Sequence, residues 1–243
     1  MRTRFATLAL LLSLAVAACG GDDGSGAGGG QGDNGKLQVV ATTTQLTDFA
    51  HVIGGDRVQV TGIIKANVDA HDFEPSPADI DAIAKAPLLI ENGFGLEQWL
   101  EDTITSSGFD GTRVVAGQGV TPIKGEDPEE GGDDPHIWQS AGNAKIMVAD
   151  IEQALAKADP GGAATYKANL DRYTAALDGL DAQIKAQVAT IPQADRKLVT
   201  NHEAFNYYAH AYGFEVVGAI IPSFDTAAEL SKLGMTAPTT VSP

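Results

Sequence analysis

Residues 161–191 read GGAATYKANLDRYTAALDGLDAQIKAQVATI, and this stretch decides how the chain is organised. Its apolar side chains recur three and four residues apart, which keeps one face of a helix on a core. They are Tyr166, Leu170, Tyr173, Leu177, Leu180, Ile184, Val188 and Ile191. A helix between the Pro160-Gly161-Gly162 break and Pro192 would reach about 45 Å at a rise of about 1.5 Å per residue. Such a helix is long enough to join two lobes, although a core helix of one domain is the alternative.

The segments on either side of this helix predict strands that alternate with helices. Before it, we expect strands at 37–43, 58–64, 88–91 and 113–116, and helices at 47–53, 77–86, 96–104 and 141–157. After it, we expect strands at 197–200 and 215–221, a helix reaching Tyr212, and another helix at 226–233. This alternation is typical of α/β folds with doubly wound parallel sheets. The fold class is therefore α/β, with two parallel-sheet lobes joined by a long backbone helix.

The N-terminus predicts an export signal with a lipid anchor. Arg2 and Arg4 precede an apolar run at 5–16 that is too short to span a bilayer but suits a secretory signal. The run ends in Val16-Ala17-Ala18-Cys19, which resembles the cleavage box of bacterial lipoproteins, where the cysteine is lipidated. A plain secretory signal is the alternative. Because Cys19 is the only cysteine, an internal disulfide and a thiolate metal cluster are excluded.

Composition places a flexible tether between this anchor and the folded body. Residues 20–36 are mostly glycine and aspartate and bury too little apolar surface to order themselves. The expected divisions are a signal peptide (1–19), the tether (20–36), an N-terminal lobe (37–158), the linking helix (159–192) and a partial C-terminal lobe (193–243). A net charge of −16 argues against a nucleic-acid partner and favours cations near the surface. We expect an extracytoplasmic monomer on the bacterial cell membrane.

Three histidines are candidate metal ligands. His71 and His202 follow predicted strands, and His136 lies in a loop between a strand and a helix. Ligands of such sheets sit at the carboxyl ends of the strands, so all three rings could converge on one cleft. Imidazoles in a site without cysteine suit Zn²⁺, or Mn²⁺ if oxygen ligands predominate.

Acidic neighbours could orient the rings. Asp69, Asp134 and Glu203 each lie within two residues of one of the three histidines and could act as hydrogen-bond partners of the ring nitrogens. His51 and His210 have no such setting, and we interpret them as surface or packing residues.

Four motifs in one order resemble a known family. They are Asp69-Ala70-His71-Asp72-Phe73-Glu74-Pro75-Ser76-Pro77, Asn92-Gly93-Phe94-Gly95-Leu96-Glu97-Gln98-Trp99-Leu100, Asp134-Pro135-His136-Ile137-Trp138 and His202-Glu203-Ala204-Phe205-Asn206-Tyr207. Together they look like the zinc and manganese solute-binding lipoproteins of ABC importers, the ZnuA/TroA-like family. The resemblance implies two lobes on a long helix, with one metal ion in the cleft between them. It places ligands at His71 and His136 in the first lobe and at His202 in the second. Histidine at this third position is similar to the zinc-binding members, whereas manganese binders often carry glutamate there.

The resemblance stops at Leu233. Family members continue with further strands and helices, including an aspartate that acts as the fourth ligand, and no counterpart is present here; Asp225 does not match that position. We therefore expect an incomplete second lobe, a site of three histidines with an open or water-filled fourth position, and a truncated family member with weakened or absent transport. Sequence just downstream of the gene would test this.

The function that these features predict is capture rather than catalysis. We expect an extracytoplasmic substrate-binding lipoprotein that delivers Zn²⁺, or Mn²⁺, to the membrane subunits of an ABC permease, and no enzymatic activity. A metal-buffering or adhesin-like surface lipoprotein without a transport role is one alternative. A zinc hydrolase is another, in which Glu74 or Glu203 would act as the base, but no HExxH helix is present.

Overall fold

The computed structural model describes residues 35–125, 132–221 and 223–226. The expected signal peptide with Cys19, the tether up to residue 34, residues 126–131 and residues 227–233 of the last expected helix lie outside the described residues. The strands are β1 (Leu37–Ala41), β2 (Val58–Gly62), β3 (Leu88–Glu91), β4 (Thr112–Val115), β5 (Lys197–His202) and β6 (Glu215–Ile221). The helices are α1 (Thr44–Gly54), α2 (Pro77–Lys85), α3 (Leu100–Ser107), α4 (Ala141–Ala158), α5 (Ala163–Val188) and α6 (Asn206–Tyr212).

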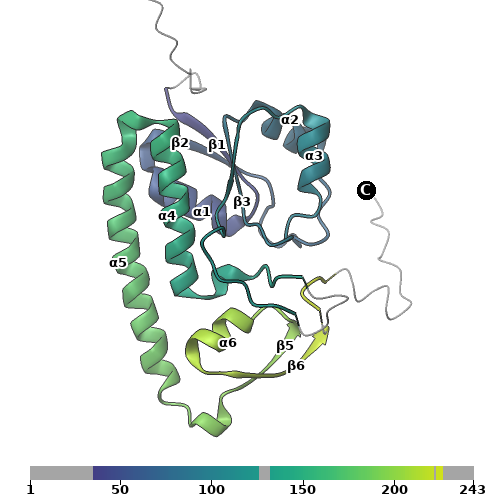
Figure 1. Ribbon diagram of the computed structural model, residues 1–243, viewed down its shortest axis with the longest axis vertical. Coiled ribbons are helices and arrows are strands. Elements are labelled where there is room, and N and C mark those ends of the chain that lie inside the picture. Colours follow the sequence, from purple (N-terminus) through teal and green to yellow (C-terminus); the bar gives the residue numbers. More distant parts are fainter. Residues whose placement is uncertain (1–34, 126–131, 222, 227–243) are drawn as a thin grey trace, which may run out of the picture.

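Two parallel sheets form two lobes, as the alternation of strands and helices predicts. The first lobe contains a four-stranded sheet with the order β2-β1-β3-β4, in which Val39 lies opposite Val60 on one side and Leu88 on the other. The second lobe contains the pair β5-β6. Figure 1 shows α5 running along both lobes, from the top of the first to the bottom of the second. The predicted fold class is confirmed.

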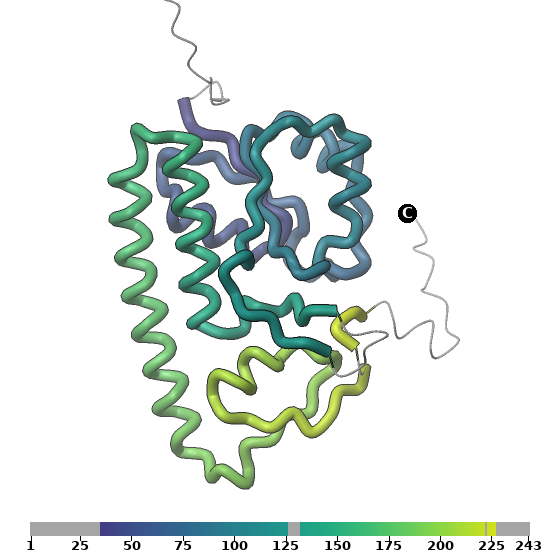
Figure 2. Tube along the Cα trace, in the orientation of Figure 1, coloured from purple at the N-terminus to yellow at the C-terminus, as the bar shows by residue number. Residues whose placement is uncertain are grey.

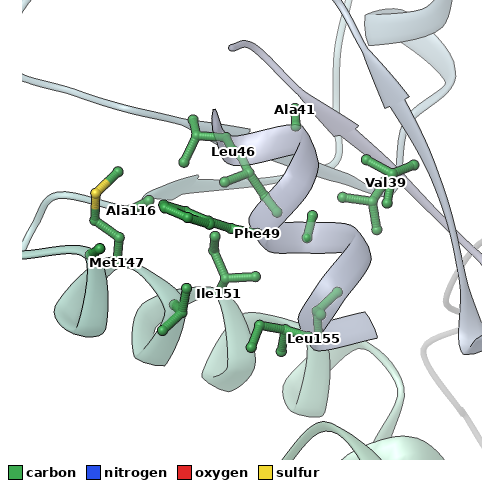
Figure 3. Packing of buried hydrophobic residues seen from close by; sticks show 14 of the residues in the cluster. Val39, Ala41, Leu46, Phe49, Ala116, Met147, Ile151 and Leu155 are labelled. Carbon is green, nitrogen blue, oxygen red and sulfur yellow. The ribbon is translucent and has the colours of Figure 1, made fainter. Parts of the chain in front are cut away.

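The core of the first lobe lies between its sheet and the helices α1 and α4. Leu46 and Phe49 on α1 face Met147, Ile151 and Leu155 on α4, as Figure 3 shows. Four of these five side chains are completely buried, and Phe49 is 8% exposed. At about 25 cal/mol per Å² of apolar surface, burying side chains of this size contributes roughly 1.5–3 kcal/mol each. This packing fixes the sheet edge from which the ligand-bearing loops leave.

The long helix matches the prediction in position and length but not along its whole apolar face. Tyr166, Leu177 and Val188 are buried, whereas Leu180 is 47% exposed, so its predicted place in the core is wrong. Helix α5 has 26 residues and α4 has 18, so the last part of α5 extends beyond α4, and Val188 in that part is buried again.

A polar network fastens the start of α5 to the first lobe. The Arg57 guanidinium donates to both carboxylate oxygens of Asp159 at 2.8 and 3.0 Å, and the Tyr166 hydroxyl donates to Asp159 at 2.6 Å. Two parallel bonds between guanidinium and carboxylate restrict orientation more than a single contact does. The helix therefore leaves the first lobe in a defined direction and carries the second lobe on its far end.

Helix α3 begins at Leu100, not at residue 96 as the sequence predicts. The segment before it is a loop because the buried Glu97 carboxylate accepts hydrogen bonds from the Asn92 and Gly93 backbones and from the Thr42 hydroxyl. Burial raises the pKa of Glu97, against the effect of these bonds. Gly93 has φ +88°, which favours glycine, and this turn draws the loop toward the sheet.

Three apolar side chains of the β5-β6 sheet are exposed. Val199, Val217 and Ile220 expose 71%, 48% and 73% of their surface. Helix α6 packs on this small sheet, as Figure 1 shows. Within the described ranges, no helix combines the length and the apolar character needed to cross a membrane.

Candidate metal site

The loop after β2 carries His71. Asp69 holds its backbone: one carboxylate oxygen accepts from the His71 N–H at 3.0 Å, and the other accepts from the Thr226 hydroxyl at 2.7 Å. Burial alone would raise the pKa of Asp69, but the hydrogen bonds from Thr226 and from the His71 backbone lower it. Asp69 is therefore an anionic anchor of the His71 backbone.

His136 is the most deeply buried of the three histidines, at 2% exposure, and Asp134 beside it is completely buried. One carboxylate oxygen of Asp134 accepts from the His136 ring Nδ1 at 2.8 Å and from the His136 backbone N–H at 2.9 Å. With its proton on Nδ1, the ring presents the lone pair of Nε2 to the cleft. Trp138 packs edge-on against the same ring, with 5.4 Å between the ring centroids.

His202 is the last residue of β5 and brings a ring from the second lobe. Its Nε2 lies 3.1 Å from His136 Nε2, and His71 Nε2 lies 3.2 Å from the same atom. One ligand atom of each histidine lies within 4.8 Å of those of the other two. In a tetrahedral zinc site with bonds of about 2.0–2.1 Å, ligand nitrogens are about 3.3 Å apart. The distances from His136 Nε2 to the other two Nε2 atoms are therefore close to the spacing that one ion requires.

The electrostatics of the cluster favour uncharged rings. Burial, followed by the neighbouring His136, lowers the pKa of His71. The same causes, burial first and then His136 and His71, lower the pKa of His202 to about 4. Imidazoles that stay neutral at pH 7 keep the lone pairs that bind metal.

A cavity of about 400 Å³ opens beside the three rings and is lined by loops of both lobes. In Figure 1, the described residues on both sides of His136 lie between the two sheets. Glu203 lines a different cavity, together with Lys124 and His210. His51 and His210 are exposed, apart from the cluster.

Several residues around the site make contacts that the sequence does not indicate. The hydroxyl of Tyr207 on α6 donates to the Asp134 carbonyl at 2.9 Å and accepts from the Ile123 N–H at 3.1 Å. Gln98 donates to Asp225 at 3.0 Å. These contacts join residues 73 to 127 positions apart, so no local pattern could have predicted them.

Comparisons with known proteins consistently point to one family of metal-binding proteins. The family described as "Zinc-uptake complex component A periplasmic" matches residues 39–237. The chain is 34% identical over 215 residues to the manganese-binding lipoprotein MntA of Halalkalibacterium halodurans, covering 88% of this chain and 69% of that protein. It is 38% identical over 183 residues to the iron-binding protein YfeA of Yersinia pestis, covering 75% of this chain and 58% of YfeA. The chain thus spans between 58% and 69% of the length of these two relatives.

Similar solved structures belong to metal-binding proteins as well. A deletion variant of ZnuA with zinc bound superposes with a TM-score of 0.72 at 27% identity, over 82% of this chain and 75% of that one. A manganese-bound variant of the periplasmic metal-binding protein from Candidatus Liberibacter asiaticus gives a TM-score of 0.70 at 27% identity, over 75% and 68% of the two chains. The resemblance seen in the four sequence motifs is confirmed: the chain belongs to the ZnuA-like family of solute-binding proteins of metal importers, which are not enzymes.

Proposed function

We propose that this protein captures a divalent metal ion outside the cytoplasm with His71, His136 and His202 and passes it to an ABC permease. The observation that supports this most directly is the spacing of the three Nε2 atoms, 3.1 and 3.2 Å from the central His136. The ion is cargo: imidazoles replace part of its water shell on binding, and the fourth position stays open to water or another donor. Asp134 orients the central ring.

Zn²⁺ is the proposed cargo, with Mn²⁺ as the alternative. Three nitrogen donors and no thiolate suit Zn²⁺, and the order of affinities for a given site places Zn²⁺ above Mn²⁺. The names of the relatives include both manganese and iron binders, and one of the similar structures contains zinc. The donor set of this chain, rather than the names of its relatives, supports the choice of zinc.

Calorimetric titration of the chelator-stripped protein tests the assignment. We expect one Zn²⁺ per chain, weaker binding of Mn²⁺, and loss of Zn²⁺ binding in a His71→Ala, His136→Ala double variant. The matched control is His51→Ala, His210→Ala, which removes two exposed histidines and should leave the affinity unchanged. Equal Zn²⁺ affinity in the two double variants would exclude the proposed ligands.

Delivery and anchoring complete the proposal. Several relatives are named metal ABC transporter substrate-binding lipoproteins, which supports Cys19 as the lipidated residue and a permease as the partner. A Cys19→Ser variant should leave the membrane fraction. A strain without the gene should grow poorly when zinc is chelated and recover with the wild-type gene. Normal growth of that strain would instead favour the metal-buffering or adhesin-like role. The hypothesis of a truncated chain stays a prediction.

A further inference from the structure

Two polar contacts hold the second lobe against the first, and each one reaches a loop that carries a first-lobe histidine. The first is the Tyr207 hydroxyl, which bridges the Asp134 carbonyl and the Ile123 N–H beside His136. Tyr207 is 5% exposed, and its bond to Asp134 is buried. Water cannot easily replace such bonds, so this contact keeps the His136 loop and α6 together.

The second contact lies on the surface and involves residues 223–226, which we name the clasp. After β6, the clasp turns back toward the first lobe, as the yellow end of the tube in Figure 2 shows. There the Thr226 hydroxyl donates to Asp69 at 2.7 Å, and Asp225 accepts from Gln98 at 3.0 Å. Both bonds are exposed to solvent.

The clasp is also attached to the second lobe next to His202. The Glu203 N–H donates to the Ser223 carbonyl at 3.1 Å, and the Asp225 N–H donates to the Ser223 hydroxyl at 3.1 Å. The clasp therefore connects the residue after His202 to Asp69, whose other oxygen holds the backbone of His71. A short path of hydrogen bonds links two of the three histidines across the mouth of the site.

Within the described part of the chain, few other contacts hold the His71 loop. Lys65, Asn67, Val68 and Asp69 are exposed, and a backbone hydrogen bond within this stretch joins Val68 to Lys65. His136 is buried and hydrogen-bonded to Asp134, whereas His71 is only half-buried. An ion can leave most easily where the ligand-bearing loop moves with the least loss of contacts, and that loop is the one carrying His71.

We propose that Thr226 and Gln98 form a releasable latch that sets how fast the metal ion dissociates, while Tyr207 keeps the lobes in register. The inference rests on the proposed function, because it assumes that the three histidines hold the ion. Opening the latch frees the His71 loop, and the buried contact at Tyr207 remains closed. The latch therefore acts on ion release and only weakly on folding.

Stopped-flow transfer of Zn²⁺ from the full-length protein to an excess of a fluorescent chelator tests the latch. Thr226→Val removes the hydroxyl and keeps the shape, and Gln98→Met removes the amide at similar length. Solvent-exposed hydrogen bonds of this kind contribute modestly, so we expect Thr226→Val to raise the dissociation rate about two- to tenfold, and the double variant to raise it further. Thr226→Ser should restore the wild-type rate.

The matched control is Thr190→Val, which removes an exposed hydroxyl that donates to the Gln187 carbonyl at 2.7 Å, after the far end of α5. Its dissociation rate should equal that of the wild type. The melting temperature of the metal-free double variant should also stay at the wild-type value, which separates a latch from a merely structural contact. If wild-type protein binds Zn²⁺ and the double variant releases it at the wild-type rate, the latch is refuted and the proposed function stands. If the wild type binds no Zn²⁺, the proposed function fails and the latch with it.

Discussion

The Asp134 carboxylate accepts hydrogen bonds from both the ring and the backbone of His136, so a single side chain fixes the position and the tautomer of the central histidine. Asp134 and His136 are both buried, which makes the charge of the carboxylate more effective than it would be in water. Tyr207 holds the Asp134 carbonyl from the opposite lobe. The geometry of the site thus depends on groups that do not touch the ion.

Replacing Asp134 by Asn should weaken Zn²⁺ binding by about 10- to 100-fold, because the ring loses its anionic partner while the side-chain size is kept. Competition with a chelator of known affinity measures the change. Asp171→Asn is the control, since Asp171 is an exposed partner of Lys167 on α5. Wild-type affinity in Asp134→Asn would show that the carboxylate charge does not tune His136.

The metal-free protein should lose stability as the pH falls from about 6.5 toward 4. The unfolded His202 titrates near 6.5, whereas burial lowers its folded pKa to about 4, so the unfolded chain binds more protons in this window. The contribution of neutral His202 to the stability of the folded state is fully present above pH 6.5. The lowered pKa of His71 also makes the folded protein less stable as the pH falls.

Urea unfolding at several pH values measures this dependence. The variant His202→Gln should show a flatter loss of stability between pH 6.5 and 4 than the wild type, and the difference between the two curves isolates the histidine from all other groups. His51→Gln replaces an exposed histidine and serves as the control. Identical pH dependence in wild type and His202→Gln would contradict the burial argument.

At the scale of the elements, α1 and α4 determine whether the ligand-bearing edge of the sheet is held in place. Ile151 is completely buried between them. Ile151→Ala should reduce the free energy of unfolding by about 2–5 kcal/mol, whereas Ile151→Val should cost about 0.5–1.5 kcal/mol. Chemical denaturation of the metal-free protein measures both values. If Ile151→Ala lowered the free energy of unfolding by less than about 1 kcal/mol, the neighbouring side chains would have to fill the cavity that the substitution leaves.

Local patterns predicted most elements well. β3 and β6 have the predicted boundaries, and α2 begins at Pro77 after the Ser76 cap, as a serine followed by proline predicts. The start of α3 was missed because Glu97 bonds to the sheet instead of continuing a helix, and that depends on tertiary contacts.

In the candidate site, too, the sequence indicated some features, whereas others depend on tertiary contacts. The sequence pointed to His71, His136 and His202 because each lies near a strand end within a recognisable motif. The contacts of Tyr207 and Thr226 could not be predicted, since their partners lie 73 and 157 residues away and no local sequence pattern indicates the partner of a hydroxyl.

At the scale of the whole molecule, the ion should act as a crosslink between lobes that the chain otherwise joins along α5. Because His202 belongs to the second lobe and His71 and His136 to the first, bound Zn²⁺ favours the docked arrangement. At a free concentration of about 100 times the dissociation constant, binding should stabilise the folded protein by about 2.7 kcal/mol.

Thermal unfolding with increasing Zn²⁺ measures this effect. The midpoint should rise with the metal concentration in the wild type and stay constant in the His71→Ala, His136→Ala double variant. A midpoint that does not depend on Zn²⁺ in the wild type would contradict binding to the folded state.

The exposed apolar side chains of the second lobe also affect the solubility of the protein. Val199 and Ile220 present apolar surface to the solvent, but a net charge of −16 makes the molecules repel one another in dilute buffer. Repulsion between molecules reaches about 10 Å at 0.1 M salt and only about 3 Å at 1 M. Concentrated salt therefore lets these surfaces meet and drives precipitation, whereas dilute buffer keeps the molecules dispersed.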